Sequence, residues 1–271
     1  MRAVLDVIGL GHTYGSGKTA HAALKDISVS VDEGEIVCLV GPSGCGKSTM
    51  LRAIAGLLRP TKGEARLHGQ KIDGVPDELA VVFQDYSRSL FPWLSVQRNV
   101  EFPLRGRSLS RAQRRQRAEE ALSAVGLVGA RRKYPWQLSG GMQQRVAIAR
   151  ALAYQPSLML MDEPFASVDA QTRGELEDLV LQVRERFGTT VLLVTHDIDE
   201  SVYLGDRVLV LSQPPTVVLD TLTVNLGRDR DQITTRASEG FVTLRSEVAR
   251  LLRKETHVSL ALSGQSLDAT N

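Results

Sequence analysis

The chain has 271 residues, of which 42% are apolar and 24% are charged, and its formal net charge is +2. This composition excludes a disordered chain, and the small net charge favours neither a polyanionic nor a polycationic partner. Aromatic residues make up only 5%, which argues against stacking along single-stranded nucleic acid, and two cysteines are too few for a disulfide framework.

Short apolar runs, rich in branched residues, recur along the chain and predict strands that are buried on both faces. They cover residues 35–40, 80–84, 157–162, 189–195 and 207–212. Helical patterns at 47–58, 171–187 and 198–205 separate several of these runs. Strands that alternate with helices predict an α/β fold with a parallel sheet.

A helical block interrupts this alternation between about residues 86 and 153, with predicted helices at 109–127 and 141–154. The segment after the last apolar run predicts a turn and short antiparallel strands. A further helix is expected over 238–253. From about residue 254 the pattern fades, so a loose tail is expected.

The segment GPSGCGKST, residues 41–49, follows a predicted buried strand and opens a predicted helix. Gly41, Gly46, Lys47 and Ser48 match the spacing G-x-x-x-x-G-K-[ST] of a phosphate-binding loop. The glycines let backbone N–H groups turn toward an anion, and the helix N-terminus adds its positive end. In such a loop the lysine bridges the β- and γ-phosphates of a nucleotide, and the serine ligates Mg²⁺.

A second glycine-rich turn, GHTYGSGKTA at residues 11–20, resembles a phosphate loop only at its end. The position five residues before Gly17 is His12 instead of a glycine. We expect no buried strand leading directly into Gly15 and no strongly apolar helix after the turn. A flexible loop is therefore predicted, and a change of Lys18 is expected to cost little.

Two acids stand at the end of the predicted strand in SLMLMDEP, residues 157–164. Phosphoryl transfer needs an acid to hold the metal and a base to orient water. Asp162 is the candidate ligand of Mg²⁺, and Glu163 is the candidate that polarises the attacking water.

The segment LSGGMQQR, residues 138–145, places a serine and two glycines directly before a strongly helical stretch. This pattern predicts a second helix start that binds an anion, without a lysine. Two such sites in one chain suggest a nucleotide held between two copies of the protein.

Together these motifs resemble the ATP-binding subunit of an ABC transporter over about residues 8–253. VFQD places Gln84 at the Q-loop of that family, VTHD places His196 at its switch position, and Tyr14 matches the aromatic residue that stacks on adenine. The segment ASVD, residues 166–169, departs from the usual Ser-Ala-Leu-Asp.

The resemblance implies an α/β P-loop NTPase fold, with a parallel sheet, an antiparallel β subdomain and an inserted helical subdomain. The implied ABC ATPase domain spans 1–253, and residues 254–271 would be a flexible tail. Its parts would be a RecA-like core at about 1–85 and 154–224, the helical subdomain at about 86–153 and a C-terminal helix at about 238–253.

The resemblance also assigns roles residue by residue, with ATP and Mg²⁺ as the ligands. ATP would be bound by Tyr14, Gly41, Pro42, Ser43, Gly44, Cys45, Gly46, Lys47, Ser48 and Thr49. The catalytic residues would be Glu163 as general base, His196 on the γ-phosphate, Gln84 and Lys47, and the Mg²⁺ ligands would be Ser48, Gln84 and Asp162. The nucleotide of a second copy would be contacted by Ser139, Gly140, Gly141, Gln143 and Asp169.

The stretch just past the Q-loop carries Leu90, Phe91 and Trp93. Apolar side chains here fit either the core of the helical subdomain or an anchor for a partner helix. In ABC transporters this region receives the coupling helix of the permease, so docking is expected near Gln84–Leu94.

LFPWLSV, MDEPFASVDAQTR and the segment NLGRDRD…FVTLRSEVARLL resemble the nitrate/sulfonate/taurine group of importers. The resemblance implies the ATP-hydrolysing subunit of a bacterial importer, in which closure of an ATP-bound homodimer drives uptake of a small anionic or sulfonate-type solute. Separate permease subunits and an external solute-binding protein would complete the system. With no secretory leader and no apolar run of membrane-spanning length, the chain is expected as a soluble protein, peripheral on the cytoplasmic face of the inner membrane.

The alternative is a soluble ABC ATPase without a transport role, acting on nucleic acid or ribosomes or in cofactor assembly. A single cassette without long coiled-coil heptads argues against it. The arginine runs at 111–117 and 130–133 are interpreted as solvated helix faces, because Glu119 and Glu120 follow the first run, and no nucleic-acid partner is expected. A second interpretation of these runs is contact with anionic lipid.

Cys45 stands beside Lys47 at the start of the helix that comes after the phosphate loop. A thiol in this position is a candidate for a lowered pKa. If its pKa is lowered, a thiol reagent would block ATPase activity and ATP would protect.

Overall fold

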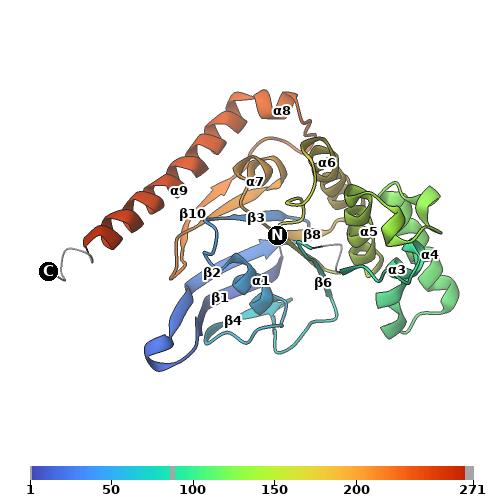
Figure 1. The fold of residues 1–271 in the computed structure, drawn as a ribbon, viewed down its shortest axis with the longest axis horizontal. Helices are drawn as coiled ribbons and strands as arrows, with labels where there is room; N and C mark the ends of the chain where they lie inside the picture. Colours follow the sequence, from blue (N-terminus) through green and yellow to red (C-terminus); the bar gives the residue numbers. More distant parts are fainter. Residues whose placement is uncertain (1, 86–88, 266–271) are drawn as a thin grey trace. The chain divides into compact units, whose positions relative to one another are not determined.

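The elements of the chain gather into two units in a computed structural model that describes residues 2–85 and 89–265 (Figure 1). Unit 1 is Met1–Pro76 with Leu192–Asn271, and unit 2 is Asp77–Val191. The α/β class predicted from the sequence is confirmed. The division differs from the expected domain bounds, because residues 77–85 and 154–191 group with the helical segment and not with unit 1.

The first sheet of unit 1 is antiparallel, with the strand order β2-β1-β4-β5. Its strands are β1 (Ala3–Tyr14), β2 (His21–Asp32), β4 (Lys62–Leu67) and β5 (Gln70–Lys71). A short 3₁₀ turn, η1 (Gly17–Thr19), connects β1 to β2. In β1, Leu5, Val7 and Leu10 are buried and Ile8 is exposed, with an irregularity in the strand between Val7 and Leu10.

The second group of strands in unit 1 has the order β10-β9-β3-β8. They are β10 (Val218–Thr223), β9 (Arg207–Leu211), β3 (Ile36–Val40) and β8 (Thr190–Thr195), which begins in unit 2. β3 runs parallel to β9, and β10 runs antiparallel to β9. Every residue of β3 and β8 is buried, which explains why their sequences are continuous apolar runs and not alternating ones.

The helices of unit 1 are α1 (Lys47–Ile54), α7 (Ile198–Leu204), α8 (Thr234–Ala237) and α9 (Glu239–Gln265). α9 packs on α7, and its side chains of Phe241 and Val248 are buried. The predicted helix end at residue 253 was wrong, because the helix continues to Gln265. No glycine or proline interrupts residues 254–263, so nothing in the backbone stops the helix there.

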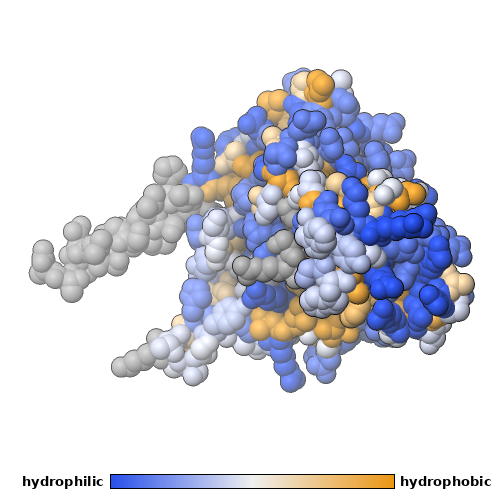
Figure 2. All heavy atoms as spheres, turned by 45° about the vertical axis from the view of Figure 1, so that its right-hand side comes forward, coloured by the Kyte–Doolittle hydropathy of each residue, from blue (hydrophilic) through white to orange (hydrophobic). Residues whose placement is uncertain are grey.

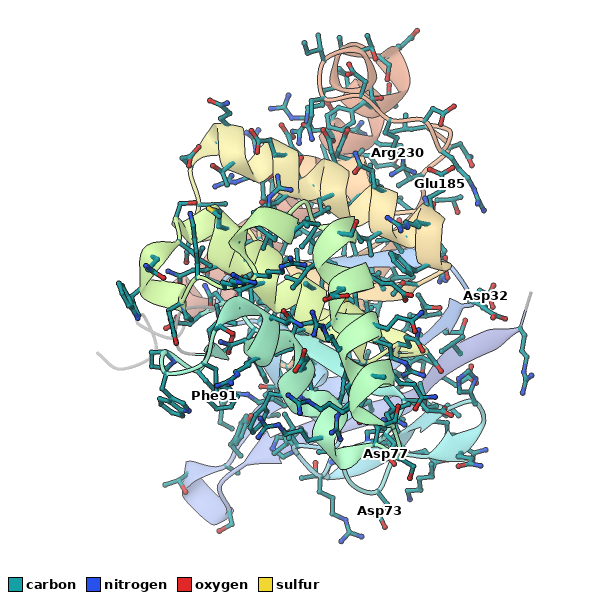
Figure 3. All side chains as sticks on the ribbon, turned by 90° about the vertical axis from the view of Figure 1, so that its right-hand side faces the viewer. Asp32, Asp73, Asp77, Phe91, Glu185 and Arg230 are labelled. Atoms are coloured by element: carbon teal, nitrogen blue, oxygen red, sulfur yellow. The ribbon has the colours of Figure 1, made fainter. Side chains whose placement is uncertain are left out.

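Unit 2 combines two parallel strands, β6 (Leu79–Val82) and β7 (Leu158–Asp162), with a set of helices. The helices are α3 (Val96–Glu101), α4 (Arg111–Ala124), α5 (Gly140–Ala153) and α6 (Ala170–Phe187), with 3₁₀ turns η2 (Phe102–Gly106), η3 (Val128–Ala130) and η4 (Pro135–Gln137). α3, α4 and α5 pack on one another, which confirms the inserted helical segment. Hydrophilic side chains dominate the face of these helices in Figure 2, and Figure 3 looks directly at them. None of the helices within residues 2–85 and 89–265 is long and apolar enough to cross a bilayer.

Candidate functional site

The predicted phosphate loop connects β3 to α1 in unit 1 and depends on its glycines. Gly44 and Gly46 both have left-handed backbones, with φ of 77° and 93°. A β-carbon at Gly46 would lie 2.9 Å from Leu24 Cδ2, and one at Gly41 would lie 2.9 Å from the sulfur of Cys45. The loop therefore has the tight turn and the close packing that the motif predicts.

Lys47 is the first residue of α1, and its side chain is only 6% exposed. Its Nζ donates to the carbonyl oxygens of Gly41, at 2.8 Å, and Pro42, at 2.9 Å. The ammonium group thus folds back over the loop that precedes the helix. The helix N-cap is Gly46, which has no side chain to accept from the first N–H groups of α1. A cation and a helix N-terminus therefore meet at one place, which suits a phosphate.

Tyr14 ends β1 and lies beside α1 of the same unit. Its hydroxyl is 3.1 Å from the hydroxyl of Thr49, and its ring stands edge-on to His12 with centroids 4.5 Å apart. The residue is 39% exposed, so a base could stack on its ring. The sequence predicted no buried strand leading directly into Gly15; β1 does run to Tyr14, but its last two residues are not buried. After the turn come η1 and a strand, so the turn lacks the helix of a phosphate loop.

In unit 2, the ends of β6 and β7 bring two predicted residues together. Gln84 Nε2 donates to Glu163 Oε2 at 3.2 Å. Glu163 has a left-handed backbone, φ 44°, and its carbonyl accepts from the N–H of Ala166 in a tight turn. Such a conformation costs a glutamate about 1–3 kcal/mol, so the surrounding turn holds it there. Asp162 is half-buried at the last position of β7.

His196 belongs to unit 1, where it stands between the end of β8 and the start of α7. Its side chain is exposed. The helix after it is capped by Asp197, whose carboxylate accepts from the N–H groups of Asp199, at 2.8 Å, and Glu200, at 3.2 Å. This cap fixes the loop that carries His196.

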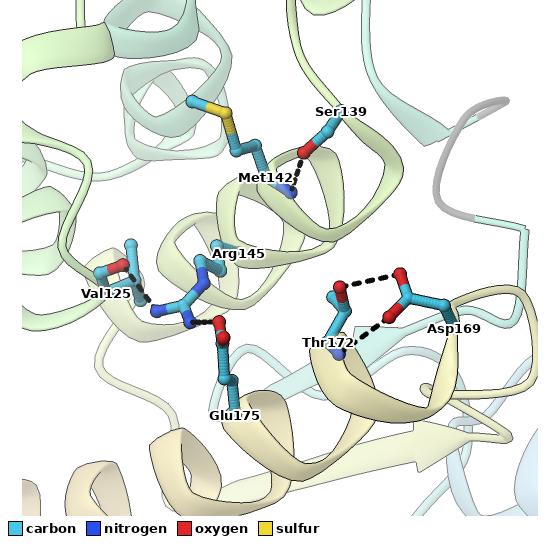
Figure 4. Close-up of polar contacts among 7 residues, drawn as sticks. All are labelled: Val125, Ser139, Met142, Arg145, Asp169, Thr172 and Glu175. Carbon is cyan, nitrogen blue, oxygen red and sulfur yellow. Dashed lines mark hydrogen bonds and ion pairs between the residues drawn. The ribbon is translucent and has the colours of Figure 1, made fainter.

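The segments LSGGMQQR and ASVD begin two helices of unit 2 that lie against each other (Figure 4). Ser139 caps α5 and accepts from Met142 N at 3.3 Å. Asp169 caps α6 and accepts from Thr172 N, at 3.0 Å, and from Thr172 Oγ1, at 2.7 Å. These hydrogen bonds from Thr172 to the carboxylate lower the pKa of Asp169. A β-carbon at Gly141 would lie 2.3 Å from Thr172 Cγ2, so the glycine permits this contact between the helices.

We expect Gly141→Ala to lower the free energy of unfolding by about 1–3 kcal/mol, because the added methyl group overlaps Thr172 Cγ2. In the double variant with Thr172→Ser, which removes that methyl group and keeps the hydroxyl on Asp169, stability should return. Urea unfolding measures both. Gly129→Ala is the control, because nothing lies within 4 Å of a β-carbon there. Equal effects of Gly141→Ala and Gly129→Ala would contradict the packing argument.

Other residues hold these segments in roles that were not predicted from the sequence. Gln143 Nε2 donates to the carbonyl oxygens of Pro135, at 3.1 Å, and Leu138, at 3.3 Å, so it fastens the chain before α5. Arg145 links Val125 O to Glu175, at 3.2 Å each (Figure 4). Such contacts join segments that are far apart in the sequence, so no local sequence pattern predicts them.

Thr216 supports the phosphate loop in unit 1 and was also missed. It is completely buried, and its hydroxyl donates to the carbonyl of Cys45. Its backbone makes two hydrogen bonds to β2. Thr216 N donates to Ala23 O at 3.1 Å, and Thr216 O accepts from Lys25 N at 2.8 Å. A single threonine after two prolines carries no sequence signal for this role.

The expectation of a lowered pKa at Cys45 was wrong. Cys45 is 0% exposed, and its burial raises the pKa of the thiol more than the nearby Lys47 lowers it. The Lys47 Nζ is 3.9 Å from the sulfur, but its short hydrogen bonds are to carbonyl oxygens. Burial likewise raises the pKa of Cys38. Both thiols are therefore protonated at neutral pH, and neither suits reaction with a thiol reagent.

Comparison with known proteins gives one consistent result. Residues 24–166 match the family described as "ABC transporter". The chain is 40% identical to the nitrate import ATP-binding protein NrtD of Synechocystis sp., over 96% of this chain and 99% of that protein. It is 44% identical to the taurine import ATP-binding protein TauB of Yersinia pestis, over 83% and 86%. A dimeric ATP-binding cassette, MJ0796, solved with ADP and Pi, matches with a TM-score of 0.70 and 35% identity, over 82% of this chain and 99% of that one.

Proposed function

The chain belongs to the ABC transporter family of ATP-binding proteins and is an ATPase, and we propose that it powers an importer of a small anionic or sulfonate-type solute. The observation that carries this proposal is the similarity to import ATP-binding proteins over nearly the whole chain. Those relatives are a nitrate and a taurine import protein. Nitrate is an anion and taurine is a zwitterion with a sulfonate group, so both solutes carry negatively charged oxygens.

The phosphates of ATP are assigned to the phosphate loop. Lys47 and the first N–H groups of α1 supply positive charge where the β- and γ-phosphates would bind. Tyr14, close to Thr49 of α1, would stack on adenine. The loop supports these roles because its residues Ser43 and Gly44 are exposed.

Mg²⁺ is the cofactor that we assign to Ser48, Gln84 and Asp162. A hydroxyl, an amide oxygen and a carboxylate are the oxygen ligands that Mg²⁺ prefers, completed by phosphate and water. Within residues 2–85 and 89–265, no cluster of three His, Cys, Asp or Glu side chains gathers. The assignment therefore rests on the chemistry of the three oxygen donors. When bound, the ion neutralises developing charge on the phosphates.

Glu163 is the proposed general base. Gln84 donates to one of its carboxylate oxygens, and the turn from Glu163 to Ala166 positions its backbone. A carboxylate in this position orients water for attack on the γ-phosphate. His196, on the capped loop after β8, is assigned to the γ-phosphate itself.

The starts of α5 and α6 are the proposed contact with the nucleotide of a second copy. Ser139, Gly140 and Gly141 would face the γ-phosphate, with Asp169 and Gln143 beside them. Two helix N-termini at one edge of unit 2 supply partial positive charge to an anion. The dimeric cassette among the similar structures supports this arrangement.

An aromatic cluster past the Q-loop is the proposed docking site for a permease helix. The ring of Phe91, labelled in Figure 3, packs at a tilt against the ring of Trp93, with centroids 5.5 Å apart, and against that of Phe102, at 4.5 Å. Trp93 is 71% exposed and Phe102 is 40% exposed, whereas Leu90 is buried core. Of the expected stretch, residues 86–88 lie outside the described part of the chain. Docking here would place the protein peripherally on the inner face of the membrane, and a solute-binding protein outside would complete the importer.

Co-expression with candidate permease subunits tests this function. We expect the protein to purify with a permease from membranes, and its ATPase rate in proteoliposomes to rise with nitrate or a sulfonate and the matching binding protein. Trp93→Ala should reduce co-purification by about tenfold or more, because exposed aromatic anchors dominate such interfaces. Ile233→Ala, at a comparably exposed apolar residue away from the cluster, is the control. Recovery with ribosomes or DNA, and no permease, would contradict the proposal.

A further inference from the structure

Two arginine runs that are separate in the sequence meet at one pocket of unit 2. The pocket has a volume of about 400 Å³. Its lining includes Arg98, Arg111, Arg115, Arg131 and Arg132. These come from α3, from the start of α4, and from the segment between η3 and η4. The runs interpreted from sequence as solvated faces thus form parts of one concave site.

The pocket carries a surplus of positive charge. Glu101 lines it, and Glu119 lies 3.0 Å from Arg115 and 4.0 Å from Arg131, so two carboxylates face five guanidinium groups. Glu101 also accepts from Gln97 Nε2 at 2.8 Å. Among the residues that the structure describes, no carboxylate forms an ion pair with any of the other three arginines.

Guanidinium groups that share a pocket repel one another unless an anion lies between them. Each presents a planar fork of N–H donors that matches the oxygens of a phosphate group. The pocket volume of about 400 Å³ lies within the range of small-molecule binding sites. We infer that this pocket binds a phosphate-bearing anion. None of its lining residues belongs to the nucleotide motifs, so the site is additional to the ATP site.

Two sources can present this chemistry, a soluble phosphate compound and the headgroup of an anionic lipid. Tyr134 lines the pocket, and its ring stacks on that of Trp136 with centroids 6.0 Å apart. Trp136 is 71% exposed. Exposed Trp and Tyr beside basic side chains are typical of contacts with a membrane surface, whereas the concave shape suits a free ligand. The experiment therefore has one arm for each source.

The first arm is calorimetric titration of the intact protein with inorganic pyrophosphate, in saturating ADP so that the nucleotide site is filled. The second arm is co-sedimentation with phosphatidylglycerol vesicles, compared with phosphatidylcholine vesicles. The test variant is Arg111→Gln with Arg132→Gln. The matched control is Arg114→Gln with Arg117→Gln. It also removes two positive charges, but both arginines are in α4 and outside the pocket lining. ADP affinity reports in every protein that the fold is intact.

We expect the test variant to bind at least one probe about tenfold more weakly than the wild type, and the control to bind it within about twofold. Loss confined to pyrophosphate identifies a soluble ligand, and loss confined to vesicles identifies a headgroup. Equal binding by the test and control variants overturns the inference, because then only total charge matters. Failure of the wild type to bind either probe overturns it as well.

Discussion

Glu163→Gln is expected to bind ATP as tightly as the wild type and to hydrolyse it about 10²–10⁴ times more slowly. The substitution keeps the size of the side chain, and its amide oxygen can still accept from Gln84 Nε2, which in the wild type lies 3.2 Å from Glu163 Oε2. The variant loses the negative charge that orients and activates water. Because the phosphates are assigned to the phosphate loop, affinity should not fall. Equilibrium binding of a fluorescent ATP analogue and the steady-state release of phosphate measure the two quantities.

The control for this variant is Glu185→Gln, an exposed acid near the end of α6. It removes the same charge from unit 2 without touching the turn after β7, so its hydrolysis rate should match that of the wild type. If the substitution blocks hydrolysis and leaves ATP binding intact, the Glu163→Gln protein should also accumulate as an ATP-bound dimer in size-exclusion chromatography. Normal hydrolysis by Glu163→Gln would remove the general-base assignment.

The central strands could be predicted from the sequence because strands that are buried on both faces consist mostly of apolar residues. β3 and β8 are buried at every residue, and their sequences are unbroken apolar runs. β1 was missed because its buried and exposed residues follow no regular period, and several register shifts interrupt its pairing with β2. The end of α9 was placed too early because the apolar stripe weakens before the helical backbone ends.

The chemistry of the site was predicted where a motif has a fixed spacing and not where contacts are long-range. Gln84 and Glu163 are 79 residues apart, and only the parallel pairing of β6 with β7 shows why they meet. Cys45 shows that a local sequence pattern can also mislead. Its neighbours in sequence suggest a reactive thiol, but the side chain is buried, and desolvation outweighs the nearby ammonium.

Lys47→Met is expected to abolish ATP hydrolysis, with a loss of at least about 10³-fold. The buried ammonium is the cation that the loop holds beside the start of α1, through bonds of 2.8 and 2.9 Å to the carbonyls of Gly41 and Pro42. Methionine keeps much of the length of the side chain but offers no donor and no charge. In contrast to Glu163→Gln, this variant should lose affinity for ATP as well, because the lysine is assigned to the β- and γ-phosphates.

Two measurements separate this effect from damage to the fold. Removing the donor leaves two carbonyl oxygens of the loop without their partner, which costs about 1–3 kcal/mol of stability, so the thermal unfolding temperature should fall modestly while the transition stays cooperative. Lys18→Met is the control, because it stands at the same place in a similar glycine-rich turn. That turn leads into η1 and β2, with no helix to bind a phosphate, so hydrolysis should change less than about twofold. Equal losses in the two variants would mean that the turn after Tyr14 takes part in binding phosphate.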